Sequence, residues 1–262
     1  MSIIVAGRHD LQLRSNVKQA YDYCFSSRAE WVLLRMYHTP YLNSMDITRR
    51  DMFARLEKVG IQTVPNGIVE DLLKRIDPAW GVVVYLDETA HMGYGKEWMS
   101  CEKALRDHPK AWASEFIPPA GRAIRHFQFG SRSFTMPFQS FDDWRCQKGD
   151  STYSYCVPGS RYEHLFPDVI PYPYWAIDFI PGTDMATDFQ FVPGTTNDRL
   201  DNWMKPRDMY RALQEAAWIL DKKDLIGGDQ ERGFGLVRVG DLVDEEAWLA
   251  RLGKHPDGGL MG

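Results

Sequence analysis

The chain has 262 residues, of which 44% are hydrophobic and 26% are charged. These fractions match ordinary globular proteins and exclude a collagen-like or intrinsically disordered chain. Its 31 basic and 36 acidic residues leave a formal net charge of -5, so no overall positive field favours nonspecific nucleic-acid binding. The length permits one large domain or about two or three small lobes.

The cysteines and apolar runs narrow the setting in which we expect the protein to work. Cys24, Cys101, Cys146 and Cys156 contain no C-x-x-C pair, so neither a zinc ribbon nor a redox dithiol is written in the sequence. The apolar run at 3–6 is too short for the hydrophobic part of a signal peptide, and no stretch approaches the ~18 apolar residues of a membrane span. We therefore expect a reducing, cytoplasmic setting.

The first third of the chain alternates between strand and helix patterns. Strands are expected at 3–6 and 31–34, and helices at 15–28, 46–59 and 69–76. Within the second helix, apolar residues recur at helical spacing, and Gly60 stands where a glycine commonly ends a helix.

The remaining chain is predicted to be rich in strands. A strand at 81–86 is followed by a Gly-containing loop at 92–96 and a helix near 97–106. Further strands are expected at 113–117, 124–129, 133–138, 174–180, 187–192 and 233–239. Residues 181–185 join two of these strands as a hairpin loop, and Pro206 begins an amphipathic helix.

Several catalytic signatures are missing from the sequence. A phosphate-binding P-loop would need a glycine five residues before Gly95, but position 90 is alanine, and no G-x-G-x-x-G follows a predicted strand. H-E-x-x-H and G-x-S-x-G are also missing, and the seven histidines stand singly. The sequence therefore does not support a zinc enzyme or a Ser-His-Asp hydrolase.

The hairpin at 174–192 carries the polar residues that point to chemistry. Asp188 and Gln190 are two apart on one strand and share a face, while Asp178 lies on the partner strand. In the simplest register, two carboxylates and one amide oxygen converge, and such hard oxygen ligands suit Mg²⁺ beside substrate phosphates. The same residues also fit the wet face of an ordinary antiparallel hairpin, so both interpretations stay open at this point.

The order of several short motifs resembles that of ATP-grasp enzymes, in particular ligases similar to the ribosomal protein S6 glutamate ligase group. Those ligases hold magnesium with an Asp on one strand and a Glu-x-Asn-x-x-Pro-Gly strand. The matching residues here are Asp178, Asp188, Gln190, Pro193 and Gly194. Asp replaces Glu and Gln replaces Asn, which keeps the oxygen chemistry and changes the reach by one methylene group.

The resemblance extends upstream in the same order, over 46–194 in all. Residues 114–117 resemble the hinge strand that reads adenine through its backbone, and 123–127 resemble the Asp-Ile-Arg-x-Phe strand. Four further segments complete the series: 52–61 resemble the helix ending Leu-x-x-x-Gly-Ile, 93–95 the flexible Gly loop that closes over ATP, 143–147 the Phe-Arg-x-Asn segment near the phosphates, and 178–194 the metal-binding strands.

The resemblance implies roles for individual residues. Asp178, Asp188 and Gln190 would hold Mg²⁺, while Arg125 and Arg145 would face the transferred phosphate or an acyl-phosphate intermediate. The expected ATP contacts are Arg49, Gly93, Gly95, Lys96, Ser114, Glu115 and Ile117.

Two positions depart from the family pattern. The family places one lysine on its first helix and another on the strand before the Gly loop, each touching ATP phosphates. Arg49 and Tyr85 stand at these places. Arginine can replace lysine as a phosphate cation, and Lys96 just after the Gly loop can supply the second charge. The alternative is that nucleotide binding has degenerated.

The fold implied is α/β (α+β) of the ATP-grasp type, with nucleotide between its last two lobes. The expected division is a small N-terminal α/β lobe at 1–45, a lid lobe at 46–112, and an antiparallel β lobe with packed helices at 113–262. The implied activity is ATP- and Mg²⁺-dependent joining of a small-molecule or peptide carboxylate to an amine through an acyl phosphate, with no membrane partner. Phosphoryl transfer is catalysed mainly by positioning and charge neutralisation, which is compatible with the missing nucleophile motifs.

Two other functions stay open. A noncatalytic nucleotide-binding or interaction protein on the same scaffold is favoured by Arg49 and Tyr85 at the usual lysine positions. A nucleic-acid modifying protein is suggested by the tyrosines between 149 and 175, which could stack bases, although the negative charge argues against it.

Overall fold

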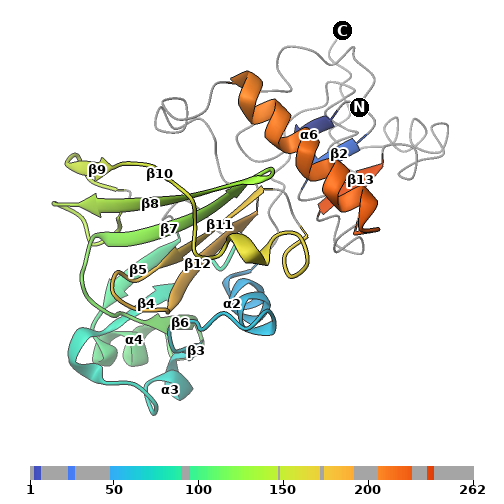
Figure 1. Ribbon diagram of the computed structural model, residues 1–262. Helices are drawn as coiled ribbons and strands as arrows, with labels where there is room; N and C mark the ends of the chain where they lie inside the picture. The colour runs from blue at the N-terminus through green and yellow to red at the C-terminus, as the bar shows by residue number, and fades with distance from the viewer. Residues whose placement is uncertain are drawn as a thin grey trace, which may run out of the picture.

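The architecture is built from three β-sheets with helices packed against them (Figure 1). The computed structural model describes residues 3–6, 23–26, 48–89, 95–146, 148–171, 174–191, 206–225 and 235–238. Among these residues, no helix combines the length and the apolar character needed to cross a lipid bilayer.

The largest sheet has six strands and is antiparallel throughout. Its strands are β7 (Arg122–Phe129), β8 (Arg132–Ser140), β9 (Thr152–Ser154), β10 (Val157–Pro158), β11 (Tyr174–Phe179) and β12 (Ala186–Phe191). The order is β10-β8-β7-β11-β12, with β9 also paired to β8. Alternate residues of β8, namely Phe134, Met136 and Phe138, are buried in the core, as a strand with one wet face requires. The long strands and the β11–β12 hairpin confirm the sequence prediction.

The second sheet has four strands in the order β3-β6-β4-β5. They are β3 (Asn66–Ile68), β4 (Val82–Tyr85), β5 (Lys96–Met99) and β6 (Trp112–Glu115), covered on one face by α3 (Val69–Leu72) and α4 (Cys101–Asp107). Val82 and Val84 of β4 pack in the small core beneath these helices. Val83 and Tyr85 point the other way and join the main core, because successive strand residues face opposite sides.

Two helices predicted beside this sheet differ from the structure. A helix was expected near 97–106, but 96–99 form β5, which pairs with β4 along its whole length. The helix begins only at Cys101, where the Ser100 hydroxyl accepts a hydrogen bond from the Lys103 N–H and caps the first turn. The helix predicted at 69–76 ends already at Leu72, and a 3₁₀ turn, η2 (Pro78–Trp80), follows.

Helix α2 (Arg49–Lys58) confirms the helix predicted at 46–59 and packs on β12. The Thr48 hydroxyl accepts a hydrogen bond from the Asp51 N–H at its start, and Gly60 follows its end with φ +79°. Its buried residues are Arg49, Met52, Phe53 and Leu56. The helical repeat thus places an arginine on the face that packs against the six-stranded sheet.

The third sheet joins distant parts of the chain. Its strands are β1 (Ile3–Ala6), β2 (Tyr23–Ser26) and β13 (Gly235–Arg238), in the order β1-β2-β13. The first and last were predicted as strands, whereas β2 lies where a helix was expected. The predicted strand at 31–34 lies outside the described residues. Helix α6 (Pro206–Lys222) begins at the predicted proline, and η3 (Glu163–Leu165) is a short 3₁₀ turn.

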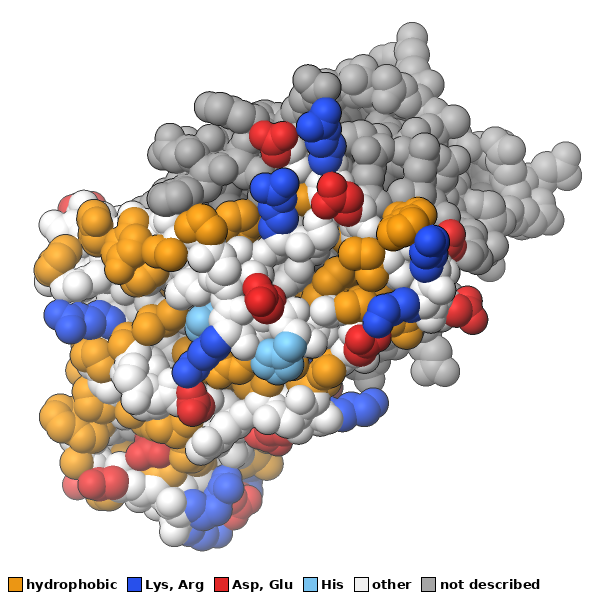
Figure 2. Space-filling view, viewed as in Figure 1, with side chains coloured by type: hydrophobic (Ala, Val, Ile, Leu, Met, Phe, Trp, Pro, Cys, Tyr) orange, Lys and Arg blue, Asp and Glu red, His pale blue; other side chains and the backbone are white. Residues whose placement is uncertain are grey.

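Described elements occur in each of the three predicted lobes, although β6 pairs with strands of the second lobe while most of its residues were assigned to the third. The exact lobe boundaries stay a prediction. On the face shown in Figure 2, acidic and basic side chains are interspersed without a large patch of one sign. A polyanion such as a nucleic acid would need such a patch, so this face offers it no obvious site.

His126 is a buried titratable group of the six-stranded sheet. Its Nδ1 lies 2.9 Å from the Ser160 hydroxyl, and its ring contacts Tyr162 and Phe179 edge-on. Burial first, and then the positive charge of Arg161, lower the pKa of His126 to about 4. The folded protein therefore keeps this imidazole neutral in mild acid.

We expect His126 to make stability fall in mild acid. An unfolded histidine titrates near pH 6.5, so between pH 6.5 and 4 the unfolded chain binds the extra proton, and the free energy of unfolding decreases by up to about 3 kcal/mol. Urea unfolding at pH 7.5 and 4.5 measures this change. The variant His126→Gln should lose this part of the pH dependence, and an unchanged pH dependence would contradict the assignment.

Candidate functional site

A pocket opens between the four-stranded and the six-stranded sheet. From the four-stranded side and the segment after β6 it is lined by Val83, Tyr85, Lys96, Ser114, Glu115, Phe116, Ile117 and Pro119. From the other side it is lined by Arg122, Ala123, Trp144, Arg145, Cys146, Lys148, Asp178, Ile180, Thr187, Asp188 and Gln190. The pocket therefore brings together most of the site residues expected from the sequence, from five separate segments of the chain.

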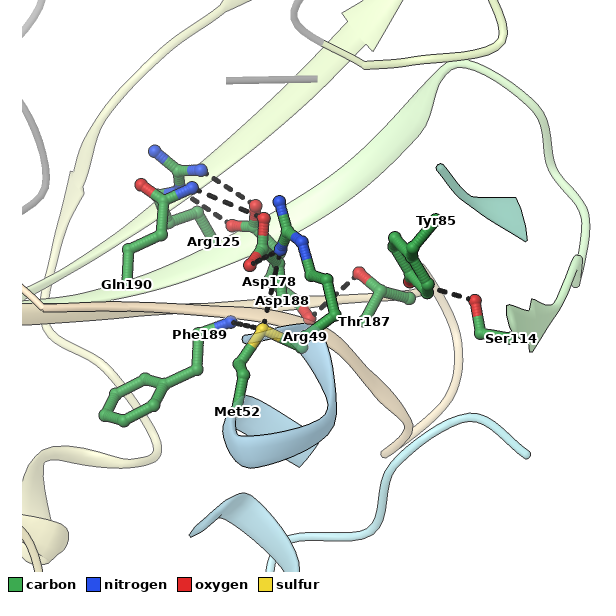
Figure 3. A network of polar contacts seen from close by, with 10 residues as sticks. All are labelled: Arg49, Met52, Tyr85, Ser114, Arg125, Asp178, Thr187, Asp188, Phe189 and Gln190. Atoms are coloured by element: carbon green, nitrogen blue, oxygen red, sulfur yellow. Dashed lines mark hydrogen bonds and ion pairs between the residues drawn. The ribbon is translucent and has the colours of Figure 1, made fainter. Parts of the chain in front are cut away.

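Three strands place the acidic residues of the pocket. Asp178 on β11 lies directly opposite Asp188 on β12 and opposite Arg125 on β7. Residues directly opposite in antiparallel strands share a face, so the register predicted for the hairpin is confirmed. Arg125 donates two hydrogen bonds to Asp178, from Nε to Oδ1 at 2.6 Å and from Nη2 to Oδ2 at 2.8 Å (Figure 3). Both side chains are buried, and Arg125 stands behind the pocket rather than among its lining residues.

The second carboxylate is held by helix α2. Arg49 Nη1 donates to Asp188 Oδ1 at 2.5 Å, and Gln190 Nε2 donates to Asp188 Oδ2 at 3.4 Å (Figure 3). Burial raises the pKa of Asp188, but the positive charges of Arg49, Lys96 and Arg125 outweigh burial and hold it below its ordinary value. Asp188 is therefore ionised, and all four carboxylate oxygens of the two aspartates accept hydrogen bonds from within the chain.

Lys96 is a cation of this site that has no ion-pair partner among the described residues. It lies on β5 directly opposite Tyr85 of β4, so the two side chains share the face that borders the pocket. Tyr85 itself is tied to Ser114, with 3.1 Å between the two hydroxyl oxygens. Among the described residues Lys96 forms no hydrogen bond or ion pair, and its Nζ lies 5.9 Å from the ring centre of Trp144. Burial, and then the charge of Arg49, lower its pKa.

The segment after β8 supplies another wall. Arg145 lines the pocket and is paired with Asp143, with 2.7 Å from Nη2 to Oδ2. Cys146 lines the pocket as well, but burial raises the pKa of its thiol to about 12, which makes it a poor nucleophile. Trp144 contacts Phe116 edge-on across the pocket. Trp144 was not predicted as a site residue, because nothing in the spacing of the sequence indicates that it lies beside Phe116.

The predicted nucleotide contacts have different outcomes. Ser114, Glu115 and Ile117 line the pocket, so the hinge segment lies where the prediction needs it. Gly95 is adjacent to Lys96, with φ +64° and its carbonyl oxygen accepting from the Asp87 N–H at 3.0 Å. Gly93 lies outside the described residues. That these residues contact a nucleotide stays a prediction.

The pocket is rich in positive charge although the whole chain is acidic. Four cations line it, namely Lys96, Arg122, Arg145 and Lys148, against three carboxylates, namely Glu115, Asp178 and Asp188. The arginines of α2 and β7 add two further positive charges behind the wall. Two of these four lining cations, Arg122 and Lys148, were not predicted from the sequence, because neither belongs to a motif. Such a pocket favours a multiply charged anion.

The oxygen donors also fit magnesium held together with such an anion. Two carboxylates and one amide on adjacent strands are ligands of the type Mg²⁺ takes while keeping water or phosphate in its other positions. In the described part of the chain, no three His, Cys, Asp or Glu side chains gather closely enough to hold a metal ion by themselves. The donor set is therefore incomplete without oxygen atoms from a ligand.

Comparison with known proteins shows which solved structures share this fold. No protein-family model matches the sequence, and no curated protein matches it. Among solved structures, D-alanine–D-alanine ligase from Bacillus anthracis is similar with a TM-score of 0.50 and 13% identity, covering 83% of this chain and 86% of that chain. The ATP-grasp ligase PsnB gives 0.46 and 11%, covering 71% and 66%. A RimK domain ATP-grasp protein from Sphaerobacter thermophilus DSM 20745 gives 0.41 and 15%, covering 66% of each chain.

The chain has an ATP-grasp fold. The predicted fold class is therefore confirmed. At this level of identity the similarity shows the shared fold alone, so the function of this ATP-grasp protein has to be argued from its own pocket.

The Asp178–Arg125 pair predicts a large effect on stability. The variant Asp178→Asn should lower the free energy of unfolding by about 3–5 kcal/mol, because it leaves the Arg125 guanidinium buried without a carboxylate. Guanidinium chloride unfolding followed by tryptophan fluorescence measures the loss. The matched control is Asp184→Asn, which breaks the exposed pair with Arg161 and should cost less than about 1 kcal/mol. Equal losses in the two variants would contradict the structural role of the buried pair.

Proposed function

We propose that this ATP-grasp protein is an ATP- and Mg²⁺-dependent carboxylate–amine ligase. The observation that supports the proposal most strongly is the cationic pocket between the two sheets, where ionised Asp188 lies close to Lys96, which has no ion-pair partner in the part of the chain that the structure describes. A nucleoside triphosphate carries several negative charges, and this charge pattern suits its phosphates. The similar ligase from Bacillus anthracis has also been solved as a complex with ATP, which agrees with the proposal.

The lining residues divide into regions suited to different parts of the nucleotide. The backbone of 115–117 and the rings of Phe116 and Trp144 form a mostly apolar region that suits a planar base. Lys96, Arg122 and the other lining cations suit the phosphates. A bound magnesium ion would neutralise phosphate charge, and Asp178, Asp188 and Gln190 are the residues that would hold it.

The proposed reaction has two displacement steps that need charge neutralisation and no protein nucleophile. An oxygen of the substrate carboxylate attacks the γ-phosphorus of ATP, and the bond between this phosphorus and the oxygen that bridges to the β-phosphate breaks. ADP is the leaving group, and the substrate becomes an acyl phosphate. The amine nitrogen then attacks the acyl carbon, inorganic phosphate leaves, and the amine loses a proton to form the amide. Arg145 and Lys96 line the pocket and would face the transferred phosphoryl group. The neutral thiol of Cys146 fits the lack of a covalent enzyme intermediate.

A second candidate is a noncatalytic nucleotide-binding protein on the same scaffold. It is favoured by the two arginine–carboxylate pairs, which neutralise the residues that would hold the metal. For the ligase, we propose as substrates a carboxylate and an amine, each carried by a small molecule or a peptide, and we propose a cytoplasmic location. The noncatalytic candidate differs from the ligase in one measurable respect: it binds ATP without consuming it.

Nucleotide binding should depend on Lys96. The variant Lys96→Met should weaken the dissociation constant for ATP with Mg²⁺ by about tenfold or more, because an unpaired phosphate-facing cation is lost from a buried position. Isothermal titration calorimetry measures the constant. The control Lys110→Met removes an exposed lysine that pairs with Glu70 outside the pocket, and it should bind ATP as the unaltered protein does. If Lys96→Met and Lys110→Met bind ATP with equal affinity, Lys96 does not contribute to the nucleotide site.

Acyl-phosphate formation can be trapped directly. With ATP, Mg²⁺, hydroxylamine and a panel of amino acids and other carboxylates, the protein should release ADP and convert at least one acid to its hydroxamate. The variant Asp188→Asn should lose this turnover, because it removes a negative charge expected to hold the metal. Circular dichroism would show that this variant is folded. ATP bound without ADP or hydroxamate formation across the panel would favour the noncatalytic candidate.

A further inference from the structure

Arg49 occupies the oxygen of Asp188 that a metal ion would need. Its Nη1 lies 2.5 Å from Asp188 Oδ1, and the guanidinium is only 4% exposed. A divalent cation at the same oxygen would stand beside a buried positive charge that water screens poorly. The second oxygen of Asp188 accepts from the amide of Gln190, the third expected metal ligand. Because Arg125 holds both oxygens of Asp178, all three expected ligands are engaged within the chain.

The position of Arg49 is set by helix α2 and not by the sheet. The backbone N–H of Arg49 donates to the Glu88 carbonyl oxygen at 2.9 Å, and Nη1 lies 3.5 Å from the Met52 sulfur one turn further along the helix. The guanidinium also lies 5.6 Å from the ring centre of Tyr85. These contacts hold the side chain behind the pocket wall, where its Nη1 reaches Asp188.

The two arginines of the site differ in how firmly they hold their aspartates. Arg125 binds both oxygens of Asp178 through two parallel hydrogen bonds from a neighbouring strand of the same sheet, whereas Arg49 binds one oxygen of Asp188 from helix α2. A phosphate group offers arginine a bidentate partner, which is a stronger arrangement than a single bond to one carboxylate oxygen. Arg49 is thus the guanidinium that a phosphate can draw from its carboxylate.

We propose that Arg49 is a built-in counter-ion of Asp188, which keeps divalent cations out of the site until nucleotide phosphates take the guanidinium and free the carboxylate. The proposal deepens the proposed function and rests on it for the identity of the phosphate ligand. Magnesium would then enter with the nucleotide and not before it. Arg49 acts through Asp188, so it is a positioning residue.

The test measures Mn²⁺ binding without nucleotide, by the loss of the free Mn²⁺ signal in electron paramagnetic resonance. The unaltered protein should bind Mn²⁺ weakly, and Arg49→Met should bind it about tenfold or more tightly, because Asp188 loses its positive neighbour. Arg50→Met is the matched control. It is the next residue of the helix, pairs with Glu88 at 3.2 Å and is half exposed, so its loss should leave Mn²⁺ binding unchanged.

A second variant guards against a folding defect in the first. Arg49→Lys keeps a cation at this place but shortens its reach, so it should bind Mn²⁺ with an affinity between those of the unaltered protein and Arg49→Met. Circular dichroism reports folding for each variant. Two outcomes would overturn the proposal. One is tight Mn²⁺ binding by the unaltered protein in the absence of nucleotide, and the other is no gain in Mn²⁺ affinity in either variant although both are folded.

A separate measurement distinguishes this proposal from the proposed function. With the nonhydrolysable analogue AMP-PNP, the unaltered protein should bind Mn²⁺ tightly and should also bind the analogue in the presence of a chelator. Failure to bind AMP-PNP under either condition contradicts the proposed function and the release by phosphate. The gain of Mn²⁺ affinity in Arg49→Met needs no nucleotide, so it reports on the counter-ion alone.

Discussion

The burial of two aspartates against two arginines is the constraint on which the site depends. Burial of the charged Asp178 and Asp188 carries a desolvation cost, which is offset because each carboxylate is paired with a guanidinium group. Arg125 of β7 pairs with Asp178, and Arg49 of α2 pairs with Asp188. The Arg49–Asp188 pair therefore ties helix α2 to the six-stranded sheet, and the Arg125–Asp178 pair joins two strands within it. The residues expected to carry the chemistry are also structural residues, so the stability and the activity of this site are coupled.

Charge is concentrated in a way that the composition conceals. The chain has an excess of acidic residues, yet the pocket between the two sheets gathers cations from β5, β7 and the segment after β8. Walls made by Phe116 and Trp144 keep part of this pocket apolar, which strengthens electrostatic interactions inside it. A site of this kind is suited to bind and orient a polyphosphate without a protein nucleophile.

In the four-stranded sheet, the pairing of β4 with β5 brings a positive charge to the pocket from a different strand than expected. Tyr85 stands where the resemblance of the motifs leads us to expect a lysine, and its hydroxyl is engaged with Ser114. Its neighbour across the strand pair is Lys96, which brings a positive charge to the same face from the other side of the Gly-containing loop. A lysine missing from one strand therefore does not mean that the site lacks its charge.

The local pattern of the sequence determined the long strands, the capped helix α2 and the hairpin that pairs Asp178 with Asp188, because these depend on spacing, turns and caps within one segment. It failed at β5, where pairing with β4 overrides a helical pattern that continues into α4. Only the tertiary structure decided that Arg49 and Arg125 neutralise the aspartates and that Lys96 has no ion-pair partner among the residues described. These contacts join residues more than fifty positions apart, and such distances in sequence leave no periodic signal.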